Sequence, residues 1–146
     1  MLAKLKAATF EVLETMFFLF PEGLEEDELV PAQGPFICTW VSISGPQPLR
    51  LGMIAPQSLA RKMAANFLGT QEEAVHKPEI EDVLKETTNM TAGSFLSKLE
   101  ASSAFHLQTP HARWLTPEEE KQKRPANRLR FDVDGELLEL FVERDT

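Results

Sequence analysis

Apolar residues recur every three or four positions in three stretches of the chain, the spacing of one face of a helix. The first stretch ends where Pro21 and Gly23 interrupt it, the second starts at Pro56 and stops at Gly69, and Pro78 opens the third. We therefore expect three helices, over residues 2–20, 56–69 and 78–102.

Five other stretches are rich in β-branched and aromatic residues and read as strands: 36–44, 49–55, 104–109, 128–133 and 137–142. Asp134-Gly135 separates the last two, a pair typical of a tight hairpin turn. The acidic stretch 22–28 and the charged stretch 117–126 read as solvated loops. This order predicts an α+β sandwich, with helices packed on one face of a mostly antiparallel sheet.

Composition narrows the partners of such a fold. The 146 residues suit a single domain over 1–146, and 15 Lys and Arg against 23 Asp and Glu give a formal charge of −8. A chain this acidic is poorly suited to neutralise phosphates, so we expect no nucleic acid and no membrane partner. Cys38 is the only cysteine and no stretch approaches the ~20 apolar residues of a membrane span, so we expect a cytoplasmic protein.

The helix expected from Pro78 carries the polar positions of most interest. Its buried face is predicted to hold Ile80, Val83, Leu84, Thr87, Thr91 and Phe95. A column of four residues spaced four, three and four apart falls nearly opposite: Asp82, Glu86, Asn89 and Gly93. They point outward, so they cannot satisfy polar groups of the core.

An outward Glu and Asn on a helix are most often plain solvated surface, and this reading stays open. Two features favour a functional one. The Thr87-Thr88 pair and Asn89 are poor helix formers, and Gly93 in mid-helix costs ~1 kcal/mol relative to alanine. A glycine there removes bulk beside a carboxylate and an amide, as a docking surface requires.

The run from Asp82 through Glu86 and Asn89 to Gly93 resembles the D-x-x-x-E-x-x-N-x-x-x-G helix of the CheC/CheX/FliY chemotaxis phosphatases. The flanking strands and helices are similar over most of the chain. The CheX branch is the most similar, because the first helix reads Glu11-Val12-Leu13-Glu14 and lacks the second E-x-x-N of the CheC branch. Ser94 departs from the asparagine often found there in the family.

The resemblance implies a hydrolase that removes the aspartyl phosphate of a phosphorylated CheY-type receiver in chemotaxis or another two-component system. Glu86 would pair with the receiver lysine and Asn89 would position the attacking water. Asp82 and Gly93 would serve docking. The family uses no cofactor or metal of its own, with Mg²⁺ expected in the receiver. The rival hypothesis is a non-catalytic adaptor that binds the receiver without hydrolysis.

Two further features of the sequence are candidates for a metal site and for a subunit interface. The three histidines, His76, His106 and His111, match no metal-ligand spacing, so we predict no metal site. The apolar run Met16–Phe20 exceeds what one helix face needs. The first interpretation of this run is burial in the core. The second is a subunit interface, which together with the family resemblance suggests a homodimer.

Overall fold

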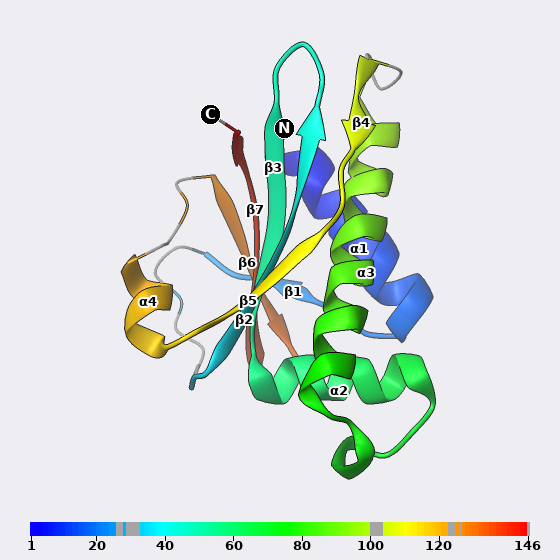
Figure 1. The fold of residues 1–146 in the computed structure, drawn as a ribbon, viewed down its shortest axis with the longest axis vertical. Coiled ribbons are helices and arrows are strands. Elements are labelled where there is room, and N and C mark those ends of the chain that lie inside the picture. Colours follow the sequence, from blue (N-terminus) through cyan, green and yellow to red (C-terminus); the bar gives the residue numbers. More distant parts are fainter. Residues whose placement is uncertain (26–27, 29–32, 100–103, 123–124, 126, 146) are drawn as a thin grey trace.

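Three long helices cover one face of an antiparallel sheet (Figure 1). The computed structural model describes residues 1–25, 28, 33–99, 104–122, 125 and 127–145. The helices are α1 (Leu2–Phe17), α2 (Gln57–Leu68), α3 (Lys77–Ser97) and the short α4 (Pro117–Gln122), with a 3-10 turn, η1 (Glu72–Ala74), before α3. In Figure 1, α4 lies across the sheet from the other helices.

The sheet has seven strands in the described part of the chain, and each of their pairings is antiparallel. They are β1 (Glu22–Gly23), β2 (Phe36–Ser44), β3 (Leu49–Pro56), β4 (His106–Leu107), β5 (His111–Leu115), β6 (Arg128–Val133) and β7 (Glu136–Arg144). Their order is β1-β6-β7-β3-β2-β4, with β5 also paired to β2. The α+β class with helices on one face of a mostly antiparallel sheet is confirmed.

The hairpin between β6 and β7 turns where the sequence predicted. Asp134 and Gly135 both have positive φ, 52° and 80°, the conformation that a two-residue hairpin turn of the right twist requires. Asp132 stabilises the turn by accepting a hydrogen bond from the Gly135 N–H at 2.8 Å. This hairpin puts β7 in the middle of the sheet beside β3.

The main core lies between the sheet and the three long helices. Alternate residues of β2 and β3 point into it, among them Ile37, Val41, Leu51 and Met53. A second, smaller cluster lies on the opposite face of the sheet and contains Phe36, Ile54, Leu115 and Phe141. Both faces of the central strands are therefore apolar, but only one is covered by long helices.

The first helix is shorter than the apolar pattern predicted. It ends at Phe17, because Phe18 adopts a left-handed conformation with φ 53° and its N–H bonds the Leu13 carbonyl. Pro21 and Gly23 are therefore not what stops it. The expected end of the third helix is also too late, since α3 ends at Ser97; residues 100–103 lie outside the described part.

Three expectations about the less regular segments are wrong. Residues 117–122 form α4 in place of a loop, with Thr116 and Glu119 bonded to each other's backbone N–H at 3.1 Å as a capping box. The segment 104–109 contains only the two residues of β4, and β5 follows it along the same edge of β2. The acidic segment contributes β1, which pairs with β6.

A close approach of two central strands explains Gly52. A Cβ at this position would overlap the ring of Phe141 on β7 and would lie 2.7 Å from the Thr39 carbonyl oxygen on β2. The Phe141 ring therefore occupies the space that a side chain at position 52 would need.

We expect Gly52→Ala to lower the free energy of unfolding by about 1–3 kcal/mol, the usual effect of overpacking a filled site. Urea denaturation monitored by circular dichroism measures the change. An unfolding free energy equal to wild type would show that the ring and the strands move aside without penalty.

Candidate site on the exposed face of α3

The helix α3 has one face in the core and one toward solvent. Its buried residues are Ile80, Val83, Leu84, Thr87, Thr88, Thr91, Ala92, Phe95 and Leu96. The four residues Asp82, Glu86, Asn89 and Gly93 are called the α3 column below; Asp82 and Glu86 are exposed, and Asn89 and Gly93 are half-buried. The predicted sidedness of this helix is thus confirmed, and the column forms a continuous strip along its outer surface.

The threonines of α3 have a structural explanation, which corrects one argument made from the sequence. Thr87 and Thr91 donate hydrogen bonds to the carbonyls one turn before them, at 2.7 and 2.8 Å. The Thr88 hydroxyl lies 2.5 Å from that of Thr39 on β2, in a fully buried contact. Thr87 is thus buried and bonded within α3, whereas Thr88 links α3 to β2, so neither residue says anything about a functional surface.

Gly93 has no such explanation within the chain. A Cβ built on its helical backbone meets no atom within 4 Å, so neither space nor conformation requires a glycine here. Alanine at this position would favour the helix by ~1 kcal/mol. The open space above Gly93 is therefore available to something outside the chain.

The carboxylate of Glu86 and the amide of Asn89 have no partner in the described part of the chain. Among the described residues, neither Glu86 nor the Asn89 amide makes a side-chain hydrogen bond or ion pair. Asp82 makes only an exposed contact, 3.7 Å from the Lys85 ammonium one turn on. A carboxylate and an amide one helical turn apart are thus both free to bind a partner.

Hydrogen bonds to α1 hold α3 in place at the Gly93 end of the column. Glu11 of α1 accepts hydrogen bonds from Ser94 at 2.9 Å and from Lys98 at 2.6 Å, and Lys98 also bonds Ser94 at 3.0 Å. The bond from Lys98, and next that from Ser94, lowers the pKa of the Glu11 carboxyl. Glu11 therefore serves to hold the two helices together beside Gly93.

Sequence reasoning identified Ser94 as a departure from the family but could not pair it with Glu11. The two residues are far apart along the chain, and only the antiparallel packing of α1 on α3 brings them together. In this structure Ser94 acts in a contact between helices.

The histidines take separate places. His76 precedes α3, and its N–H is bonded by Glu79 at 2.9 Å; His106 lies in β4. His111 stacks on Trp40, with ring centroids 5.6 Å apart. Within the described ranges, no three His, Cys, Asp or Glu side chains gather as metal ligands would.

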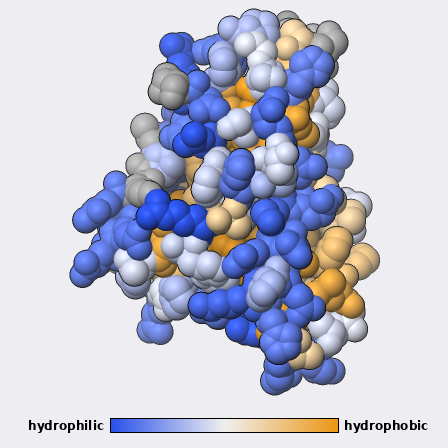
Figure 2. Space-filling model, in the orientation of Figure 1, coloured by the Kyte–Doolittle hydropathy of each residue, from blue (hydrophilic) through white to orange (hydrophobic). Residues whose placement is uncertain are grey.

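The apolar run at the end of α1 is divided between the core and the surface, and Figure 2 shows hydrophobic residues gathered on the surface at the lower right, where α1 ends. Phe17 is buried, whereas Met16, Phe18 and Phe20 are exposed to 41%, 76% and 70%. Phe67 at the end of α2 packs on Phe17 with ring centroids 5.8 Å apart and is itself 40% exposed. Core burial thus accounts for only part of this run, and the homodimer stays a prediction.

Solved structures share this fold over nearly the whole chain. CheX from Desulfovibrio desulfuricans matches with a TM-score of 0.72 and 17% identity, covering 98% of this chain and 97% of that one. CheX of Borrelia burgdorferi, solved in complex with CheY, BeF₃ and Mg²⁺, matches at 0.68 and 19%, covering 98% and 97%. FliY from Thermotoga maritima matches at 0.63 and 11%, covering 94% and 83%.

These matches place the chain in the class of proteins with the fold shared by CheX, CheC-like proteins and FliY. Residues 37–130, which include the whole of α3, match the family model of the chemotaxis phosphatase CheX. The chain therefore belongs to the CheX family, as the resemblance in sequence indicated.

A search of curated proteins finds none similar to this chain. Among the helices of the described residues, none is both long and apolar enough to span a bilayer.

Proposed function

We propose that the α3 column is the active surface of a phosphatase that hydrolyses the aspartyl phosphate of a CheY-type receiver. The observation that carries the proposal is Gly93, a helix-weakening residue that nothing among the described residues requires, one turn from Asn89 and two turns from Glu86 in the same column. The family match to a chemotaxis phosphatase and the relative solved with CheY and Mg²⁺ support a receiver as the substrate.

Glu86 is proposed to bind the lysine of the receiver's active site. Its exposed carboxylate lacks an ion pair within the described chain, so it is free to form a charge-assisted hydrogen bond with an ammonium group. This contact would set the register of α3 on the receiver. Asp82 would add a peripheral contact, and Gly93 would allow the receiver backbone to approach the helix.

Asn89 is proposed to position the water. Its amide oxygen accepts a hydrogen bond from the water, and its amide N–H donates one, so the water is oriented without an added negative charge near the phosphoryl group. The water oxygen then attacks phosphorus in line, the bond from phosphorus to the aspartyl oxygen breaks, and the carboxylate leaves. The amide of Asn89 does not act as a base, so the proton lost by the attacking water passes to a phosphoryl oxygen or to solvent.

The reaction needs no cofactor bound to this chain. Mg²⁺ held by the receiver, together with the receiver lysine, would neutralise the charge on the transferring phosphoryl oxygens. The contribution of α3 is then positioning, which suits a rigid helix anchored to the sheet through Thr88 and to α1 through Ser94.

The test is the decay of phosphorylated CheY-type receivers of the same organism, with Mg²⁺, at substoichiometric amounts of this protein. We expect faster loss of phosphate from at least one receiver. Glu86→Ala should raise the protein concentration needed for half-maximal rate by about tenfold, since it removes a charge-assisted contact. Binding of a phosphorylated receiver without faster decay would favour the adaptor, and no binding at all would leave only the fold.

A further inference from the structure

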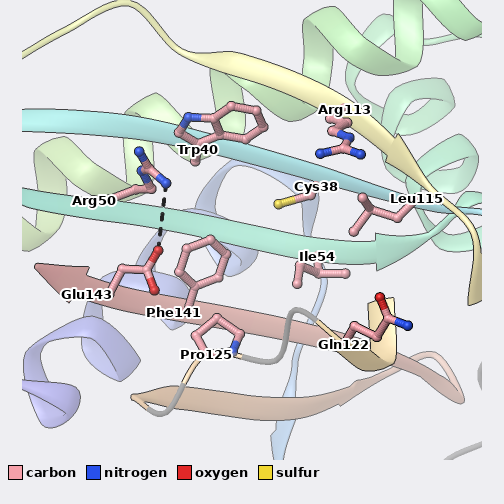
Figure 3. A pocket seen from close by; sticks show the side chains of 10 residues that line it. All are labelled: Cys38, Trp40, Arg50, Ile54, Arg113, Leu115, Gln122, Pro125, Phe141 and Glu143. Atoms are coloured by element: carbon pink, nitrogen blue, oxygen red, sulfur yellow. Dashed lines mark ion pairs between the residues drawn. The ribbon is translucent and has the colours of Figure 1, made fainter. Parts of the chain in front are cut away.

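A second site lies on the face of the sheet opposite the α3 column. It is a pocket of about 650 Å³ between the outer surface of the sheet and the segment around α4 (Figure 3). A volume of this size fits a small organic ligand. The pocket is formed by side chains from β2, β3, β5 and β7 together with Gln122 and Pro125.

The floor of the pocket is apolar and firmly held. Ile54 and Leu115 are buried, and Phe141 is fixed across Gly52 by the close approach described above. The Trp40 indole forms part of the wall, half-buried and stacked on His111. This surface favours a flat, largely apolar molecule.

Two guanidinium groups stand beside that apolar floor. In Figure 3, Arg50 and Arg113 lie on either side of Trp40. Arg50 Nε is buried and has no hydrogen-bond partner among the described residues, an unfavourable state for a donor. Arg113 donates to Glu119 through one nitrogen at 2.9 Å. A guanidinium group has five N–H donors, and the remaining donors of Arg113 have no acceptor in the described part of the chain.

The carboxylates near the pocket determine which of these two arginines can bind a ligand. Arg50 is held by Asp145 at 3.2 Å and lies 3.9 Å from Glu143, which itself lines the pocket. Among the residues that the structure describes, Arg113 is paired only with Glu119, and their side chains are 51% and 36% exposed. An exposed pair of this kind contributes little, so a carboxylate from a ligand can replace Glu119 on Arg113.

We propose that this pocket binds a small planar organic carboxylate, with its apolar body on Ile54 and Phe141 and its carboxylate on Arg113. Guanidinium binds carboxylate in a two-point geometry, which fixes the ligand's orientation. The site lies across the sheet from Glu86 and Asn89, so its occupant does not compete with a receiver for the α3 column. The proposal does not rest on the phosphatase reaction.

The probe is sodium 2-naphthoate, titrated into ¹⁵N-labelled protein while the two tryptophan indole signals are followed. Trp40 lines the pocket, whereas Trp114 lies elsewhere and donates to Glu81 at 2.7 Å. We expect a saturable shift of the Trp40 signal, assigned with Trp40→Phe, and an unchanged Trp114 signal. The uncharged 2-naphthamide should bind about tenfold more weakly.

Variants of the anchor should act in opposite directions. Arg113→Gln should weaken naphthoate binding about tenfold, whereas Glu119→Gln, which removes the competing carboxylate, should strengthen it. Lys6→Gln on α1 removes one positive charge elsewhere and should change nothing. Arg113 is exposed, and a glutamine at position 119 can still accept the hydrogen bond from the Thr116 N–H that caps α4, so these changes should leave the fold intact.

Three results would overturn the proposal. Naphthoate could fail to shift Trp40, or it could bind wild type, Arg113→Gln and Glu119→Gln with one affinity. The third is a Trp40 signal that changes with protein concentration while naphthoate does not bind, which would mean that a second copy of the chain covers the pocket.

Discussion

Asn89→Ala is expected to slow receiver dephosphorylation about 10²–10³-fold, the usual effect of removing a group that acts on the reacting atoms. Binding of the phosphorylated receiver should change little, because Glu86, Asp82 and Gly93 keep their contacts. Within the described chain the Asn89 side chain makes no hydrogen bond, so its loss should also leave the free energy of unfolding unchanged. The measurement is single-turnover decay of the phosphorylated receiver at saturating protein.

Two further variants sharpen this prediction. Asn127→Ala, the same change at an exposed position outside the α3 column, should behave as wild type. Asn89→Asp keeps the shape but brings a negative charge toward the phosphoryl oxygens, so it should be about as slow as alanine. An Asn89→Ala variant that retains most of its turnover would remove Asn89 from the mechanism and leave Glu86 alone to account for the site.

Gly93→Leu is expected to make the protein more stable and less active. Leucine is a much better helix former, and a Cβ at this position meets no atom within 4 Å, so the free energy of unfolding should rise by ~1 kcal/mol. The added side chain would stand where the receiver backbone must approach. Receiver binding should therefore weaken by about tenfold or more, with Gly93→Ala showing the same gain in stability and a smaller loss of binding.

Gly52→Ala provides the opposite control, because there the added methyl group should destabilise the fold. Urea denaturation and receiver titration, carried out on the three glycine variants, separate the two effects. A Gly93→Leu variant with higher stability and undiminished receiver binding would show that the glycine is not a docking contact.

Periodicity was sufficient to predict the sides of α3. Alternation between buried and exposed positions is a local property, so Ile80 and Val83 could be assigned to the core and Glu86 to the surface from their spacing alone. The Asp134-Gly135 turn was equally local, since both residues tolerate positive φ. Features that depend only on residues close together in the chain, such as the buried side of a helix or a two-residue turn, could therefore be predicted from the sequence.

Features that depend on packing could not be read in this way. Phe18 ends α1 in a left-handed conformation, which is uncommon for phenylalanine and could not be predicted from the residue type. The partnership of Thr88 with Thr39, and of Ser94 with Glu11, exists only once helices and sheet are assembled. The helix α4 is a different case, because the spacing of Thr116 and Glu119 fits a capping box and could have been recognised.

The two glycines, Gly52 and Gly93, should have different histories among relatives of this protein. Gly52 is constrained within the same chain by the Phe141 ring and by the Thr39 carbonyl oxygen, so it should stay glycine whatever partner the protein binds. On the proposed function, the constraint on Gly93 comes from the receiver. In a lineage that has lost its receiver, position 93 should drift toward alanine and other helix formers while position 52 stays glycine.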